Sequence, residues 1–303
     1  MNTDQALQAF LEEHRLPSAY RQIIDRWFAP LAEGLAARHA TAGRPLLIGI
    51  NGSQGSGKST LAALLTILLA ERHGLRSIDL SIDDFYLTRA QRQQLAQDVH
   101  PLLATRGVPG THDVALMRDT LQQLMQRQGP VAVPRFDKAA DDRLPPAQWP
   151  QTEAPLDLVL IEGWCFGTQA QAQAALEAPV NQLESDEDPD GTWRRYVNHA
   201  IEHDYQPLYQ DVDAWIMLQA PSFDCVYQWR LEQEAKLVEK IAQQGGQGTQ
   251  LMSAPQLARF IQHYQRLTEH ALRTLPAQVD YLYRLDAQRN IISFSQAHAE
   301  QYG

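Results

Sequence analysis

The sequence predicts an α/β fold, a three-layer α/β/α sandwich around a mostly parallel sheet. Short apolar runs that are typical of buried strands, such as residues 46–50, 156–161 and 215–218, alternate with longer segments of helical periodicity. The chain has 303 residues, 44% of them hydrophobic, which is enough for one large core. We therefore expect residues 1–303 to form a single domain.

A glycine-rich segment follows the first strand. Residues 52–59 read G-x-x-x-x-G-K-S, and leucines then recur at spacings of three and four from Leu61 to Leu69, which predicts a helix. A strand, a glycine loop and a helix in this order are the context of a phosphate-binding loop. The glycines let the backbone come close to phosphate oxygens, and the N–H groups at the start of the helix attract anions. The expected fold is therefore that of a P-loop NTPase.

The residue types of this loop suit ATP and Mg²⁺. Lys58 can place its charge on the β- and γ-phosphates, which makes it a catalytic candidate, and the Ser59 hydroxyl can ligate Mg²⁺. The residues expected to bind the nucleotide are Gly52, Ser53, Gln54, Gly55, Ser56, Gly57, Lys58, Ser59 and Thr60.

Strands and helices alternate through the rest of the chain. Residues 1–40 predict an N-terminal helical extension, broken near Pro17, and residues 184–190, ESDEDPD, predict an exposed acidic turn. The glycine-rich stretch after residue 243 predicts a mobile loop. We expect the other strands over residues 77–82, 131–133, 156–161, 215–218, 281–285 and 291–294, and the other helices over residues 88–98, 114–126, 193–201, 224–243 and 254–273.

Two acidic residues stand at the carboxyl ends of two expected strands, which we take to be adjacent. Asp83 follows the second strand and Glu162 follows the 156–161 run. A kinase needs an acid that holds its metal and a base that takes the proton of the acceptor hydroxyl, and parallel sheets build their sites at the carboxyl ends of strands. Asp83 and Glu162 are therefore catalytic candidates, and Glu162 joins Ser59 as a metal candidate. Asp84 is the alternative to Asp83, and strand-end acids also serve as helix caps.

Cationic residues occupy the loops expected at the same edge. Arg106, Arg135, Lys138 and Arg143 could hold an anionic acceptor, because a guanidinium can fork onto a carboxylate. They could equally pair with the aspartates of the loop over residues 135–143.

For three further residues, the sequence fits a structural role and a binding role equally. His112 could contact the substrate or form part of a turn, and Tyr86 lies just after the Asp83 strand end. Arg230, on the helix expected from residue 224, could reach the nucleotide phosphates or face solvent.

Composition limits the partners. The net charge of −10 argues against binding to nucleic acid or to an anionic membrane, and no apolar stretch is long enough to span a bilayer. Cys165 and Cys225 stand far apart and indicate no disulfide framework, and the first sixteen residues lack the apolar core of a signal peptide. We expect a cytoplasmic protein with a small-molecule substrate.

Five segments in order carry a resemblance to a known family. GSQGSGKST, SIDDFYLT, RGVPGTHD, VPRFDKAADDR and IEGW resemble the D-glycerate 3-kinase family, a branch of the P-loop kinases related to pantothenate kinase, uridine kinase and phosphoribulokinase. NQLESDEDPDGTWRRYVN and VYQWRLEQE also resemble the glycerate kinase branch, and the likeness covers roughly residues 45 to 295.

The resemblance implies a function and roles for single residues. It implies phosphorylation of D-glycerate to 3-phospho-D-glycerate with Mg·ATP, with Asp83 as general base and Glu162 beside the metal and the acceptor. It implies that Arg143 contacts the acceptor and that the helix bearing Arg230 belongs to a helical lid over about residues 224–252. The segment RGVPGTHD differs from its counterpart in uridine kinase-like members, which implies an acceptor other than a nucleoside.

Two other classes of function are weighed against this one. A nucleotide-binding regulator would need an element such as the guanine-reading N-K-x-D motif, which the sequence lacks. A nucleic-acid-dependent ATPase would need a basic stripe, and the charge is acidic. A kinase of the pantothenate or uridine kinase group that acts on another small hydroxylated acceptor remains an alternative.

Overall fold

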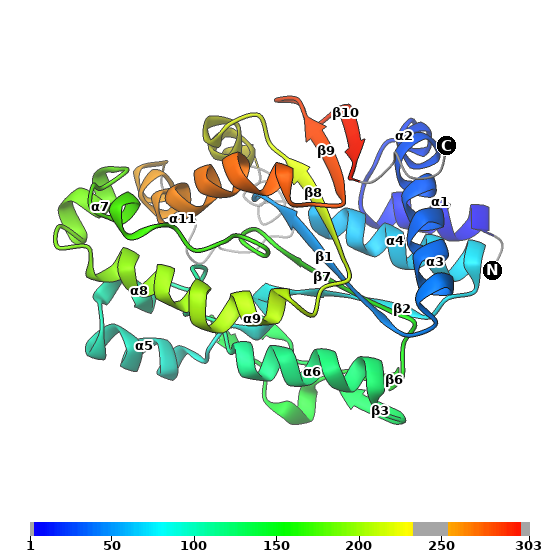
Figure 1. Ribbon diagram of the computed structural model, residues 1–303, viewed down its shortest axis with the longest axis horizontal. Helices are drawn as coiled ribbons and strands as arrows, with labels where there is room; N and C mark the ends of the chain where they lie inside the picture. Colours follow the sequence, from blue (N-terminus) through cyan, green and yellow to red (C-terminus); the bar gives the residue numbers. More distant parts are fainter. Residues whose placement is uncertain (1–2, 233–253, 298–303) are drawn as a thin grey trace, which may run out of the picture.

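The computed structural model describes residues 3–232 and 254–297 (Figure 1). Within these ranges six strands form the main sheet, in the order β10-β9-β8-β1-β7-β2. All neighbours pair in parallel except β9 and β10, which are antiparallel, so the prediction of a mostly parallel sheet is confirmed. The strands are β1 (Leu46–Gly52), β2 (Ser77–Ser81), β7 (Leu158–Gly163), β8 (Ala214–Gln219), β9 (Tyr281–Leu285) and β10 (Ile291–Gln296).

Helices cover both faces of the sheet. Alternate residues of β1 point to opposite sides, so Leu46, Ile48 and Ile50 pack in one core and Leu47 in the other. The first core contains α1 (Thr3–Glu13), α3 (Ala29–Ala42), α4 (Lys58–His73) and the helical residues 223–232. The second contains α6 (Val114–Gln126), α8 (Thr192–Ala200), α9 (Gln206–Tyr209) and α11 (Ala254–Thr274).

Shorter elements connect these layers. The expected strand over residues 131–133 exists, but it lies outside the main sheet, where β3 pairs with β6 in antiparallel fashion. The expected helical extension at the N-terminus is confirmed and is interrupted after Glu13. The remaining elements are α2 (Tyr20–Ile23), α5 (Arg89–Asp98), β3 (Gly129–Ala132), β4 (Phe136–Asp137), β5 (Asp142–Arg143), β6 (Gln151–Ala154) and the short helical turns η1 (Ile24–Phe28), η2 (Ile82–Phe85), η3 (Pro101–Ala104), η4 (Pro146–Gln148), η5 (Gln173–Leu176), η6 (Ile201–Tyr205) and η7 (Leu275–Ala277).

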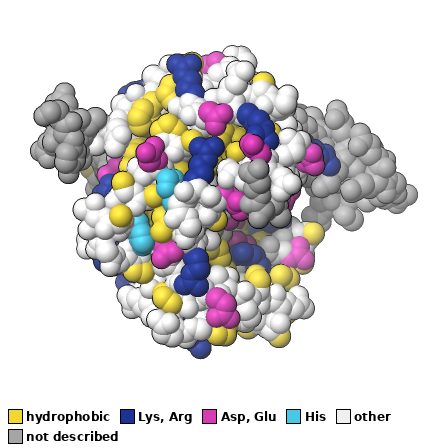
Figure 2. Space-filling model, turned by 90° about the vertical axis from the view of Figure 1, so that its right-hand side faces the viewer, with side chains coloured by type: hydrophobic (Ala, Val, Ile, Leu, Met, Phe, Trp, Pro, Cys, Tyr) yellow, Lys and Arg dark blue, Asp and Glu magenta, His cyan; other side chains and the backbone are white. Residues whose placement is uncertain are grey.

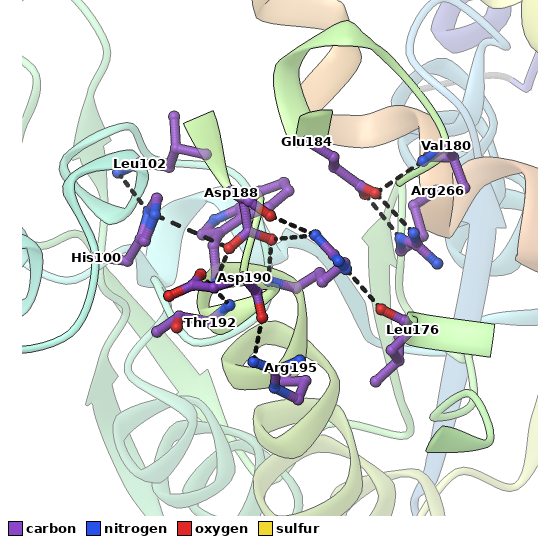
Figure 3. Close-up of polar contacts among 12 residues, drawn as sticks. His100, Leu102, Leu176, Val180, Glu184, Asp188, Asp190, Thr192, Arg195 and Arg266 are labelled. Carbon is purple, nitrogen blue, oxygen red and sulfur yellow. Dashed lines mark hydrogen bonds and ion pairs between the residues drawn. The ribbon is translucent and has the colours of Figure 1, made fainter. Parts of the chain in front are cut away.

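The acidic ESDEDPD segment is exposed at five of its seven residues, as predicted, but residues 184–187 are helical and two of its acids, Glu184 and Asp188, are buried. It contributes to helix α7 (Gln182–Glu187), and both Glu184 and Asp188 have 0% exposed area. Arg266 of α11 holds the Glu184 carboxylate with two hydrogen bonds of 2.7 and 2.6 Å (Figure 3). Arg194 of α8 holds Asp188 at 3.0 Å. The partners lie far along the chain or on the next helix, where local composition cannot reveal them.

The predicted lid extends beyond the described residues. The helix expected from residue 224 is present up to residue 232. The rest of the expected lid, residues 233–252, lies outside the described residues. In the ranges that are described, every helix is too short or too polar to cross a membrane.

Candidate active site

The glycine loop joins β1 to α4 in a compact turn. Gly55 and Gly57 have φ angles of +81° and +92°, which side chains other than glycine rarely adopt. A Cβ on Gly55 would lie 2.7 Å from the Cβ of Trp229, so this position also needs glycine for space. The turn between β9 and β10 supports the loop from outside, because Arg289 Nε donates to the Gly55 carbonyl at 2.9 Å.

Several polar atoms of the loop are buried without a hydrogen-bond partner in the protein. They are Ser53 Oγ, Gln54 Oε1 and Ser56 Oγ, and the Glu162 Oε2 atom behind them is in the same state. Buried polar groups in folded proteins almost always have a hydrogen-bond partner, so these atoms are suited to a ligand.

Lys58, Ser59 and Glu162 form one polar cluster at the base of the loop. The Ser59 hydroxyl donates to Glu162 Oε1 at 2.6 Å, and Lys58 Nζ lies 3.8 Å from Glu162 Oε2. No group of three or more His, Cys, Asp or Glu residues suited to a metal occurs in the described ranges. Mg²⁺ needs only one or two protein oxygens when phosphates and water supply the rest. The hydroxyl and the buried carboxylate therefore fit Mg²⁺ bound together with a nucleotide.

Asp83 lies in η2, directly beyond the carboxyl end of β2. Because Ser81 of β2 pairs with Glu162 of β7, the two acidic candidates come from adjacent strands, as expected. The Tyr86 hydroxyl donates to Asp83 Oδ1 and Lys138 Nζ donates to Oδ2, both at 2.7 Å. Burial raises the pKa of Asp83, but Lys138 and the Tyr86 hydrogen bond outweigh it and lower the pKa to about 2.

Asp84 faces the same space but is tied to the next segment. Its Oδ1 accepts from the Phe136 amide at 3.2 Å, and its Oδ2 lies 3.3 Å from Arg135 Nη1. Burial raises its pKa above the usual value. Asp84 thus anchors the β4 strand beside Asp83.

These residues surround one cavity of about 690 Å³, a size typical of small-molecule sites. Of the residues singled out from the sequence, Gln54, Gly55, Lys58, Ser59, Asp83, Asp84, Tyr86, Arg106, Arg135, Lys138, Glu162 and Arg230 line it. Arg106 pairs with Asp141, and its guanidinium lies 5.3 Å from the centre of the Phe136 ring.

Arg143 and His112 do not line this cavity. Arg143 Nη1 donates to Asp113 Oδ2 at 3.0 Å, and Asp113 in turn caps α6. His112 stacks on the Tyr86 ring with 4.5 Å between the ring centres, and its Nδ1 lies 2.5 Å from the Tyr205 hydroxyl. Burial lowers its pKa to about 4, so its ring is neutral near pH 7. His112 supports Tyr86 from behind.

Helix α11 supplies a wall that the sequence did not reveal. Phe260, Ile261 and Tyr264 line the cavity, and the Tyr264 ring packs edge-on against Trp164 at 4.9 Å. Apolar residues at this spacing on a helix usually indicate core packing, so the sequence carried no signal for this role. Arg266 on the same helix makes the fork with Glu184 that joins α11 to the α7 segment (Figure 3).

The sequence has relatives among known kinases. No protein-family model matches the sequence. The chain is 33% identical over 251 residues to the uncharacterized kinase mug58 of Schizosaccharomyces pombe, a match that covers 78% of this chain and 84% of that protein. It is 32% identical over 243 residues to the chloroplastic D-glycerate 3-kinase of Arabidopsis thaliana, covering 77% of this chain and 49% of the plant protein, so the chain matches about half of that relative's length.

A solved structure supports the fold. The D-glycerate 3-kinase of Cryptococcus neoformans matches with a TM-score of 0.72 and 24% identity, covering 93% of this chain and 100% of that one. The identity and coverage of the fission-yeast match establish kinship. The chain therefore belongs to the P-loop kinases of the D-glycerate 3-kinase family, and it is a phosphotransferase with an alcohol group as acceptor.

Proposed function

We propose that this kinase transfers the γ-phosphoryl group of Mg·ATP to the 3-hydroxyl of D-glycerate, with Asp83 as general base. The observation that carries the proposal is the shared cavity, in which Asp83 and the phosphate loop face the same space as Lys138, Arg106 and Arg135. The name of the plant relative supports glycerate as the acceptor.

The phosphate loop has the groups that phosphoryl transfer requires. In this proposal Lys58 and the loop amides hold the phosphates, and the unpartnered Ser56 hydroxyl donates a hydrogen bond to them. Ser59 and Glu162 hold Mg²⁺, which neutralises phosphate charge when bound. Arg230 lies on the cavity wall and is assigned to the phosphates. These side chains stabilise the charge that spreads over the transferred group.

The acceptor side has the charge that a hydroxy acid requires. Glycerate is small, so its carboxylate is the main handle by which an enzyme can orient it. Arg106, Arg135 and Lys138 line the cavity, whereas Arg143 is paired with Asp113 outside it. We therefore assign the carboxylate contact to the three lining cations in place of Arg143. With the carboxylate held there, the far hydroxymethyl group points to Asp83, which takes its proton as the oxygen attacks the γ-phosphorus.

The proposal also covers location and partners. Cys165 and Cys225 are both free thiols, which supports a reducing compartment such as the cytoplasm. On the face shown in Figure 2, basic and acidic side chains are interspersed and the described basic residues form no broad patch. Together with the net charge of −10, this supports a small-molecule acceptor over nucleic acid.

An acceptor panel tests the proposal. ADP release is measured with D-glycerate, glycerol, pantothenate, uridine and ribulose 5-phosphate, and the position of the phosphate in each product is determined by ³¹P and ¹³C NMR. We expect D-glycerate to give the highest kcat/KM and 3-phosphoglycerate as its product. Pantothenate or uridine equal to glycerate in kcat/KM would overturn the assignment of the acceptor.

A further inference from the structure

Both oxygens of the proposed base are engaged. Tyr86 donates to Asp83 Oδ1 and Lys138 donates to Oδ2, each at 2.7 Å. A general base must offer an oxygen within hydrogen-bond reach of the proton that it abstracts. An adjacent ammonium stabilises the charged carboxylate and so opposes its protonation. As it stands in the structure, Asp83 is therefore held in a state that takes up a proton poorly.

Tyr86 and Lys138 differ in how easily each can move away from Asp83. The Tyr86 ring is 4% exposed and is packed between His112 and Phe136, with ring centres 4.5 and 5.1 Å away. The Lys138 side chain is 63% exposed and extends from the turn between β4 and β5. Asp84 anchors the start of that hairpin through the Phe136 amide, so the Lys138 ammonium can move on its stem while the backbone stays in place.

The cavity around Lys138 offers its ammonium an alternative partner. Lys138 lines the same cavity as Arg106 and Arg135, the cations assigned above to the acceptor carboxylate. A carboxylate bound in the cavity would offer the Lys138 ammonium an ion pair of the same kind as the one with Asp83, whose side chain is 28% exposed. Exchange of the Asp83 carboxylate for a second carboxylate in the cavity would therefore cost little.

We propose that Lys138 is a latch on Asp83 that the carboxylate of the acceptor opens. The bound carboxylate takes the ammonium from Asp83 Oδ2, and that oxygen then accepts the proton of the acceptor hydroxyl. The hydroxyl oxygen forms its bond to the γ-phosphorus as the bond to the β-phosphate oxygen breaks and ADP leaves. The inference rests on the proposed function, and it makes the acceptor carboxylate a requirement for turnover as well as for binding.

Glycerol provides the test because it has the hydroxyls of glycerate without the carboxylate. In the wild type, glycerol leaves the latch closed, so its kcat is low. In Lys138→Met the latch is absent, and we expect kcat for glycerol to rise several-fold. For glycerate, loss of a charged contact should lower kcat/KM by about ten-fold to over a hundred-fold. Opposite changes for the two acceptors are the signature of a latch, because a lysine that only binds glycerate would leave glycerol turnover unchanged.

The control is Arg127→Met, which removes one positive charge from an exposed side chain at the end of α6 that is bonded only locally, to Gln123. This variant should change the turnover of neither glycerate nor glycerol. If Lys138→Met lowers glycerate turnover and leaves glycerol unchanged or lower, Lys138 is only a binding residue and the latch is wrong. If Lys138→Met leaves the turnover of both acceptors unchanged, the latch is likewise wrong. If the wild type fails to phosphorylate glycerate at all, the proposed function fails first, and the two failures are thereby distinguished.

Discussion

Mild acid should destabilise this fold through His112. The side chain is 5% exposed, its Nδ1 faces the Tyr205 hydroxyl, and its Nε2 is buried without a partner. Protonation would therefore place a charged N–H where nothing accepts it. The pKa is lowered from 6.5 to about 4 by burial, the largest cause, which the charge of Asp83 only partly offsets.

The sign and size of the effect follow from the two pKa values. Because the folded pKa lies below the unfolded one, the unfolded chain binds the proton first as the pH falls. The contribution of neutral His112 to stability is complete above about pH 6.5 and is lost progressively down to about pH 4. A shift of about 2.5 pKa units corresponds to about 3 kcal/mol in full, of which about 2 kcal/mol is lost by about pH 5.

Urea unfolding followed by circular dichroism at about pH 7.5 and about pH 5 measures this loss. The chain has ten histidines, so the informative quantity is the difference between the wild type and His112→Gln, which cannot titrate. We expect the pH dependence of the variant to be smaller by about 2 kcal/mol. Tyr205→Phe is the control, because it removes the hydrogen bond and retains the titrating ring. Equal pH dependence in the wild type and His112→Gln would refute the reasoning.

Two further predictions concern the base and the buried ion pair. Asp83→Asn should lower kcat by about 10²–10⁴-fold with ATP affinity within a few-fold, and Asp84→Asn should cost less; the reverse order in steady-state kinetics would assign the base to Asp84. Glu184→Leu alone should lower the free energy of unfolding by about 3–5 kcal/mol, because it leaves Arg266 buried and unpaired, whereas adding Arg266→Met should restore most of the loss. A double-mutant cycle by urea unfolding with no coupling between the two changes would contradict this account.

Local pattern was enough to predict the elements that build the phosphate site. Residues 52–59 combine a strand end, glycines and a helix start within one short stretch, so this strand, loop and helix can be predicted from local sequence. The placement of Asp83 and Glu162 at one edge of the sheet could also be predicted, because both follow parallel strands, and the structure shows those strands to be neighbours. The mostly parallel sheet and the layers of helices could be predicted for the same reason, since period and strand length are local properties.

Long-range pairing set the limit of prediction. Arg143 was expected beside the acceptor, but it does not line the cavity and pairs with Asp113, thirty residues earlier. Glu184 and Asp188 looked exposed from their acidic neighbours, but arginines of α11 and α8 bury them. The wall formed by α11 carries no distinctive residue type, because apolar side chains on a helix serve a cavity and a core equally well.

The contact between Arg289 and the Gly55 carbonyl has a consequence for the synthesis of the chain. The two residues are 234 positions apart, so the glycine loop leaves the ribosome long before the turn that supports it. At about 5–20 residues per second, the interval is roughly 10 to 50 s. During that time the Gly55 carbonyl can bond only to water or to other parts of the nascent chain. The nucleotide site is thus among the first segments to be made and among the last to be completed.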